Sequence, residues 1–303
     1  MTRHIRGRSF MFLAFLVGSF ILYLTPLLSL IRFAWGSNTY SYIPLIPLVS
    51  AYLFFECRKK TFSDSNRWHL AGGVPIAFAI LLYALWASQG GRLSTPDDLA
   101  LMALSFVTLL VGGLGLFYGV KAWKAAEFPI LFLLFMIPIP SFILDKIVLF
   151  LQKWSAGAAY VFFGLTGVPM YRDGFLFHLP GLTIEVAKEC SGIHSSISLF
   201  LVSLLAGHLM LRENWRKATL TLSIVPITII KNAVRIVTLS LLGVYVDPRI
   251  LGSEAHRRGG IPIFFLALVL LGSVLWLLRR GEKKGSEQYA AGAKVRPAPM
   301  EGK

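Results

Sequence analysis

Cysteine is scarce in this sequence, with only Cys57 and Cys190 among 303 residues. Two cysteines argue against the disulfide framework of a small secreted domain, and without a C-x-x-C motif a thiol oxidoreductase is disfavoured. In the topology predicted below, the two residues lie near opposite membrane faces. A disulfide needs Cα atoms within about 7 Å, so we expect them not to be joined.

Several other motifs are missing. The sequence has no cluster of metal ligands, no glycine-rich phosphate loop and no dinucleotide-binding motif, so we expect neither a metal nor a cofactor. Acidic residues are also few, with 15 Asp and Glu against 30 Lys and Arg. In a soluble protein this excess would suggest nucleic acid. Here the basic residues lie between apolar blocks, so we attribute them to membrane topology and predict no nucleic-acid partner.

Long apolar blocks dominate the chain, which is 55% hydrophobic with a mean hydropathy of +0.67. This pattern predicts an all-α polytopic membrane protein with about eight transmembrane helices. The first block is too long for a secretory signal and has no clear cleavage site, so we interpret it as an uncleaved anchor. The predicted spans are approximately 10–33, 40–55, 70–87, 99–120, 128–144, 190–210, 218–244 and 261–278.

The segment between the fifth and sixth spans differs from the others. Polar residues recur along 145–167, which favours an amphipathic helix in the membrane interface over a span. Residues 168–189 alternate and are rich in turn formers, which predicts a small extracytoplasmic hairpin or loop. The tail after Gly281 is polar and rich in Gly, Ala and Pro, so we expect it to be disordered.

The distribution of basic residues selects the orientation. Segments 1–8, 57–69, 120–125, 211–217 and 279–303 hold 19 Lys and Arg, and the segments on the opposite side hold 8. The richer side is cytoplasmic, so both termini are predicted to be cytoplasmic. Cys190 then begins the sixth span at the extracytoplasmic face.

Cys190 is the first candidate for chemistry, in the stretch "EVAKECSGIHSSISLF". A cysteine in a membrane helix is most often a small hydrophobic residue. This one follows Glu189 and precedes Ser191 and Gly192, where the chain turns from polar to apolar. The glycine allows close backbone approach, and a thiolate at the boundary can meet a substrate.

Lys231, Asn232 and Arg235 are the second candidate, because their spacing places them roughly on one helix face within the seventh span. An ionisable group inside a membrane costs at least ~2.5 kcal/mol and usually marks function. Counting from Ala218, Arg235 lies about 25 Å along the helix, at the level where Cys190 begins its span. The alternative is snorkelling to the headgroups, which suits Arg235 better than Lys231.

His256, in the loop before the eighth span, is the third candidate. A loop histidine is usually a solvated surface residue, but this one is predicted on the same face as Cys190 and Arg235. A histidine can produce a nucleophilic thiolate, and an arginine can stabilise the oxyanion of a tetrahedral intermediate. The three residues together suggest acyl transfer at a peptide carbonyl.

Four stretches resemble the exosortase/archaeosortase family of multi-span cysteine transpeptidases. They are "PILFLLFMIPIPSFI", "EVAKECSGIHS", "NAVRIVTLSLLG" and "EAH", in the family's order over roughly 129–278. The resemblance implies that Cys190 is the nucleophile and that Arg235 and His256 are essential. It divides the chain into amino-terminal helices (1–128), a catalytic transmembrane core (129–280) and a cytoplasmic tail (281–303).

The resemblance also implies a substrate and a location. Such enzymes are proposed to act in the cytoplasmic membrane of prokaryotes, on exported proteins with a carboxy-terminal sorting signal. The signal is a short motif such as Pro-Glu-Pro, a transmembrane helix and a basic cluster. The expected partners are these proteins and membrane lipid, and the oligomeric state stays open.

One position departs from the family. His194 stands where the family commonly has arginine, four residues after Cys190 and so on the same helix face. His194 is therefore an alternative base, with His256 favoured. Glu189, Asn232 and Lys231 are possible supporting residues. The departure also leaves the substrate motif open.

Two other functions compete. Lys231 and Arg235 in a span near Pro226 would suit a transporter or flippase, although no internal repeat supports it. The third alternative is a scaffold without enzymatic activity. In that case Cys190, Arg235 and His256 could each be substituted without a phenotype.

Overall fold

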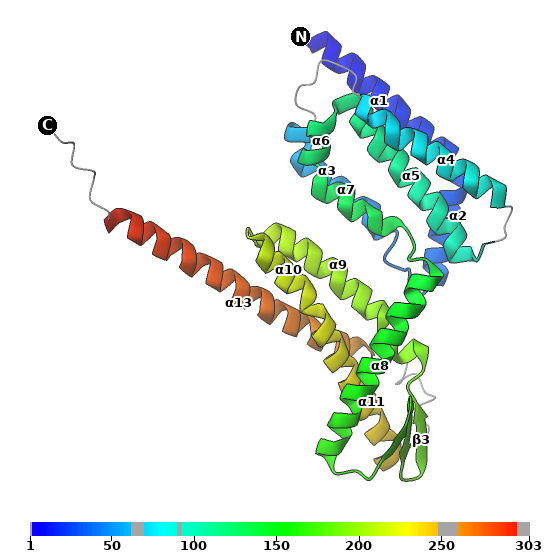
Figure 1. The fold of residues 1–303 in the computed structure, drawn as a ribbon, viewed down its shortest axis with the longest axis vertical. Coiled ribbons are helices and arrows are strands. Elements are labelled where there is room, and N and C mark those ends of the chain that lie inside the picture. The colour runs from blue at the N-terminus through cyan, green and yellow to red at the C-terminus, as the bar shows by residue number, and fades with distance from the viewer. Residues whose placement is uncertain (1, 62–69, 90–92, 248–259, 296–303) are drawn as a thin grey trace. The chain divides into compact units, whose positions relative to one another are not determined.

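The structure, a computed structural model, describes residues 2–61, 70–89, 93–247 and 260–295. Most of these residues are helical, and one small sheet interrupts the helices (Figure 1). The chain divides into two compact units, Met1–Asp145 and Lys146–Lys303. Each unit is described by itself.

The described part of the first unit contains helices joined by turns, and no strand. Its most buried helix is α5, and η1 approaches it so closely that a Cβ at Gly72 would lie 2.1 Å from the Leu116 nitrogen. Tyr23 fixes α5 from another side, because its hydroxyl lies 2.6 Å from Ser105 Oγ. Its elements are α1 (Thr2–Leu22), α2 (Leu24–Gly36), α3 (Leu45–Thr61), η1 (Leu70–Gly72), α4 (Gly73–Gln89), α5 (Thr95–Tyr118), α6 (Val120–Ala125), α7 (Glu127–Leu133) and η2 (Leu134–Met136).

The first predicted span is not one straight helix. The apolar run predicted over Phe10–Phe33 bends by 64° between α1 and α2. Pro26 lies in the first turn of α2, where proline is tolerated, but its ring clashes with the carbonyl group four residues earlier. The same apolar composition therefore forms two helices.

The fifth predicted span, Phe128–Leu144, is wrong as a continuous helix. The apolar helix Glu127–Met136 ends before "IPIP", and the next helix begins at Ser141. Pro138 and Pro140 lack amide hydrogens and disfavour helical conformation in the residues before them. Hydropathy does not register this interruption.

In its described residues, the second unit combines five helices with a three-stranded antiparallel sheet in the order β1-β2-β3. Figure 1 shows the sheet beside one end of α8 and α11. Its helices are α8 (Ser141–Thr166, which begins in the last residues of the first unit), α9 (Ile193–Met210), α10 (Asn214–Leu222), α11 (Ile224–Tyr245) and α13 (Gly260–Val295), with β1 (Tyr171–Asp173), β2 (Leu176–Leu179), β3 (Leu182–Glu185) and η3 (Lys188–Ser191).

The sheet confirms the small hairpin structure predicted over 168–189. Gly174 and Gly181 form its two turns with φ of 58° and 74°, values that glycine adopts without a Cβ penalty. Phe177 and Leu179 of β2 join Val186 in a core that includes residues of α8 and α11. The sheet is therefore anchored to two helices of the second unit.

Helix α8 covers the segment that was predicted to lie in the membrane interface. It is continuous for 26 residues and is apolar and long enough to cross a membrane. Gln152, one of the polar residues that favoured an interfacial position, is 5% exposed. The charged residues of the same segment, Asp145, Lys146 and Lys153, are exposed, so its position in the interface stays a prediction.

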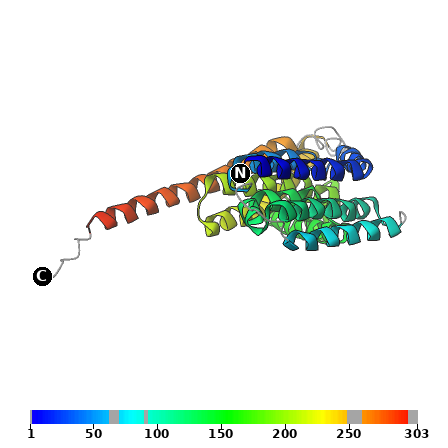
Figure 2. The ribbon, with the colours of Figure 1, turned by 90° about the horizontal axis from the view of Figure 1, so that it is seen from above.

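The seventh predicted span consists of α10 and α11, which meet at Ser223, three residues before Pro226 in the first turn of α11. The last helix, α13, continues to Val295 through part of the tail predicted to be disordered, as Figure 1 and Figure 2 show. Its second half contains Glu, Lys, Gln and Ala, which are good helix formers.

Within the described residues, six helices are long and apolar enough to cross a membrane, or seven if the bent pair α1–α2 forms one span. The all-α polytopic fold is therefore confirmed, and the number eight stays a prediction. The predicted second span corresponds to α3, a helix of 17 residues.

Candidate active site

Cys190 lies in η3, the short 3-10 turn between β3 and α9. Gly192 follows it and is the N-cap of α9, with φ of 74° and ψ of 15°. A residue with a side chain rarely adopts this left-handed conformation, so glycine lets the chain turn abruptly into the helix. The carbonyl group of Gly192 accepts hydrogen bonds from the hydroxyls of Ser195 and Ser196, at 3.0 and 2.7 Å.

The strand side of this turn is held by Val186, which is 1% exposed. Its amide donates to the Phe175 carbonyl at 2.9 Å, and its carbonyl accepts from Gln152 Nε2 at 2.5 Å. A buried carbonyl group requires such a partner, because an unpaired one would cost free energy. Gln152 thus ties α8 to the chain four residues before Cys190.

The helix side of the turn packs against α11. A Cβ placed on Gly192 would lie 3.0 Å from Asn232 Oδ1 and 3.6 Å from Lys231 Nζ. The absence of a side chain at Gly192 therefore permits the close approach of the turn to α11. The sequence predicted that the glycine after Cys190 allows close backbone approach. The structure shows that the approaching residues are Asn232 and Lys231.

Lys231 and Asn232 form the buried part of this contact, with exposed fractions of 3% and 1%. Lys231 Nζ donates a hydrogen bond to Ser195 Oγ in the first turn of α9. Snorkelling would bring this ammonium group to the surface, and the structure instead directs it to α9. Arg235 lies one turn farther along α11, partly exposed, with its Nε buried.

The predicted site residues are therefore only partly brought together. The structure joins the turn of Cys190 to the helix of Lys231, Asn232 and Arg235. His194 lies in the first turn of α9 and is exposed. His256 falls outside the described residues, as do the side chains of Glu189 and Cys190, so the pairing of thiol and histidine stays a prediction.

Two residues at the site were missed by the sequence reasoning. Ser195 is part of the motif around Cys190, but a hydroxyl in the first turn of an apolar helix gives no signal about its partner. Gln152 was noted as polar and interpreted as facing the interface. Their roles depend on contacts with residues 36 and 34 positions away, Lys231 and Val186.

Among the described residues, no group of three or more His, Cys, Asp or Glu could hold a metal ion. The polar groups gathered at this turn are instead amides, hydroxyls and cations. Such groups can stabilise negative charge in a substrate or intermediate, particularly where water is excluded.

Comparison with known proteins identifies the family. The family model described as transmembrane exosortase matches residues 35–273, which is more than half of the chain and includes every candidate site residue. Neither the search of curated proteins nor the search of solved structures found a match. With the resemblance of its motifs confirmed by this match, the chain belongs to the transmembrane exosortase family.

Proposed function

We propose that this protein is a membrane cysteine peptidase or transpeptidase that cleaves carboxy-terminal sorting signals of exported proteins. Cys190 would be its nucleophile, with Arg235 and His256 as the assisting residues. The proposal places the reaction at the outer face of a prokaryotic cytoplasmic membrane, with both termini cytoplasmic. Membership of the exosortase family supports it.

One observation carries the assignment of the site. The turn that contains Cys190 packs through Gly192 against Asn232 and Lys231, one turn before Arg235. Residues about 40 positions apart in the sequence thus belong to one local structure. That is the arrangement expected if a thiol and an arginine act on the same peptide bond.

The chemistry follows from these groups. His256 would take the thiol proton, and the sulfur would attack the carbonyl carbon of the substrate. Arg235 would stabilise the resulting oxyanion. The C–N bond would then break as His256 returns the proton to the leaving amine, and a thioester would remain.

Water or an amine would next attack this thioester and release the product while the thiol is restored. The first turn of α9 would also stabilise the oxyanion that forms in each attack. The amides at a helix N-terminus lack partners within the helix and favour nearby negative charge. The acceptor nucleophile determines whether the outcome is hydrolysis or transfer.

The expected substrate has a short recognition motif followed by its own transmembrane helix and a basic cluster. Such a helix would place the scissile bond at the membrane boundary. Cys190 precedes the long apolar helix α9 by three residues. The thiol and the scissile bond would therefore both lie just outside an apolar helix, at the membrane boundary. His194 is kept as the alternative base because it lies in the first turn of the same helix.

The test replaces Cys190 in cells that produce an exported protein with such a signal. Cys190→Ala is expected to abolish processing while the protein stays at normal abundance in the membrane. Cys57→Ala is the matched control, since Cys57 lies in α3 of the other unit. Unchanged processing by Cys190→Ala would contradict the proposal.

The same variants separate the transporter interpretation. A transporter that uses the cations of α11 would lose activity with Lys231→Met or Arg235→Gln and tolerate Cys190→Ala. His256→Ala and His194→Ala, measured side by side, distinguish the two histidines: the residue whose loss abolishes processing is the base.

A further inference from the structure

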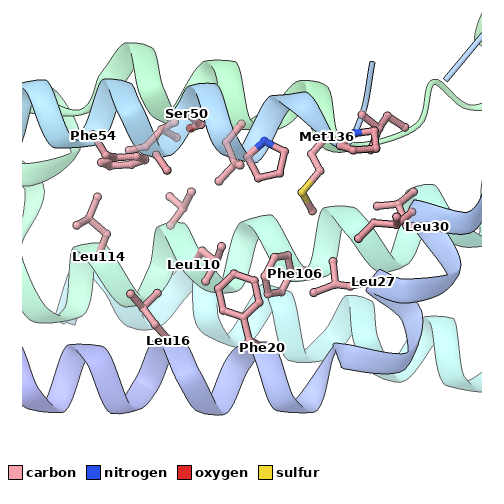
Figure 3. Close-up of a pocket in the computed structure, with 18 of the residues that line it drawn as sticks. Leu16, Phe20, Leu27, Leu30, Ser50, Phe54, Phe106, Leu110, Leu114 and Met136 are labelled. Atoms are coloured by element: carbon pink, nitrogen blue, oxygen red, sulfur yellow. The ribbon is translucent and has the colours of Figure 1, made fainter. Parts of the chain in front are cut away.

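The first unit contains an apolar slot with a volume of about 440 Å³. Figure 3 shows it between two layers of helices, with Phe54 and Leu114 at one end and Leu30 and Met136 at the other. Among the described residues that line it, Ser50 alone has a polar side chain. Its hydroxyl donates to the Pro129 carbonyl at 2.7 Å, so the slot offers hydrocarbon contacts only.

The slot is elongated along the helices. On α5 its lining extends from Phe106 to Leu114, eight residues or about 12 Å of helix. A bilayer has a hydrocarbon core about 30 Å thick, so an acyl chain of one leaflet reaches about 15 Å. The slot therefore matches the length of one acyl chain.

The lining residues restrict the chemistry of the occupant more than its size. They offer hydrocarbon contacts and no free polar side chain, as an acyl chain requires. The exposed side chain of Phe20, which lines it, also shows that the slot is not sealed from its surroundings.

The end of the slot at Phe54 is bordered by cations. Phe12 and Phe54 line the slot and pack on the same cluster, which includes Leu114 and Tyr118. Arg8 lies one helical turn before Phe12, with its guanidinium 5.2 Å from the centre of the Tyr118 ring.

On α3, Arg58 lies one turn after Phe54 and is exposed, with its guanidinium 3.7 Å from the centre of the Phe55 ring. Its Nη1 donates to the Phe55 carbonyl at 2.7 Å. The lining at the opposite end, at Leu27, Leu30 and Met136, is apolar. Arg8 and Arg58 thus lie one helical turn beyond the lining at the Phe54 end, and Arg32, next to Ile31 on α2, is an exposed cation at the other end.

We propose that this slot binds one acyl chain of a glycerophospholipid whose anionic headgroup lies against Arg8 and Arg58. Charge complementarity selects an anionic lipid, because two cations at the membrane surface attract it by electrostatics that a zwitterionic headgroup lacks. In the topology predicted from the sequence this end faces the cytoplasm. The slot is formed by residues of the first unit and Cys190 belongs to the second, and the test of lipid binding does not depend on the proposed reaction.

The test uses the purified full-length protein in detergent, titrated with phosphatidylglycerol or phosphatidylcholine, with bound lipid counted by native mass spectrometry. The wild type is expected to hold one phosphatidylglycerol about tenfold more tightly than phosphatidylcholine. Arg8→Gln with Arg58→Gln is expected to remove this preference. Arg32→Gln, an exposed arginine of α2, is the charge control and is expected to keep it.

A second pair of variants tests the slot itself. Ala51→Phe fills it from an exposed position on α3 and is expected to reduce binding of both lipids at least tenfold. Ala77→Phe, on an exposed face of α4 outside the slot, is expected to bind as the wild type does. Equal binding of the two lipids by the wild type, or unchanged binding by Ala51→Phe, would overturn the proposal.

Discussion

The substitution Gly192→Ala tests whether the packing of the cysteine turn on α11 matters for the reaction. With φ of 74°, alanine at this position costs about 1–2 kcal/mol relative to glycine. Its Cβ would also lie 3.0 Å from Asn232 Oδ1, closer than ordinary contact, so the turn must move by a few tenths of an ångström. Both effects act two residues from the proposed nucleophile.

The expected loss of activity follows from this shift. A misplacement of about 1 Å at a reacting group costs on the order of 100-fold, so we expect Gly192→Ala to slow processing by about tenfold or more. The assay is a pulse-chase measurement of the processed fraction of a signal-bearing protein, at matched abundance of the enzyme in the membrane.

Two further variants sharpen this result. Gly157→Ala, in α8, has normal helical φ and nothing within 4 Å of the new Cβ, so it is expected to process at the wild-type rate. Gly192→Asn relieves part of the backbone strain, because asparagine tolerates positive φ, but keeps the contact with Asn232. A wild-type rate for Gly192→Ala would refute the argument that this packing positions Cys190.

The remaining predictions concern polar and glycine contacts. Gln152→Ala leaves the buried carbonyl group of Val186 unpaired and is expected to destabilise the protein by about 1–3 kcal/mol, whereas the exposed Lys153→Ala changes little; thermal unfolding in detergent measures both. Gly72→Ala places a Cβ 2.1 Å from a backbone nitrogen of α5 and is expected to prevent folding, whereas Gly73→Ala meets nothing within 4 Å; size-exclusion chromatography after extraction decides. Lys231→Met removes the buried cation at similar length and is expected to reduce processing at least tenfold in the pulse-chase assay, and an unchanged rate would contradict its role.

Hydropathy predicted the class of fold well, because long apolar segments must be removed from water, whether they face lipid or the protein core. The helices α4, α5 and α9 fall close to their predicted spans, and the sheet lies where alternation and turn residues predicted it. Average hydropathy treats apolar runs as continuous and does not register proline. Pro138 therefore interrupts the fifth predicted span, and a bend of 64° near Pro26 divides the first into two helices that can still form one span.

Composition also misjudged polar residues. Gln152 was interpreted as facing the interface because polarity carries no information about a partner 34 residues away. The predicted tail after Gly281 is partly helical because its residues favour a helix once α13 provides a preceding turn. A short stretch of sequence predicts neither the partner of Gln152 nor the helix after Gly281, because each depends on residues outside that stretch.

The candidate site was predictable as a set of residue types but not as a geometry. Ionisable residues inside apolar runs pointed to Lys231 and Arg235, and a boundary cysteine pointed to Cys190. The sequence does not say that Gly192 is the point of contact between them, because the required complement is the side chain of Asn232. A glycine beside a cysteine is equally compatible with a turn, a helix cap or the close approach of a different helix.

Gln152 and Lys231, two of the buried polar side chains around the cysteine turn, have the same physical role. Gln152 holds the carbonyl before the turn, and Lys231 holds the hydroxyl of Ser195 after it. Each lies in a long helix where an apolar residue would suit the membrane better, and each is nearly inaccessible to solvent. Polar groups buried in such places persist when their hydrogen bonds fix a geometry that apolar packing leaves free to shift. The turn with Cys190 is thus fastened on both sides, from α8 and from α11, and a fixed nucleophile is what a reaction at one peptide bond requires.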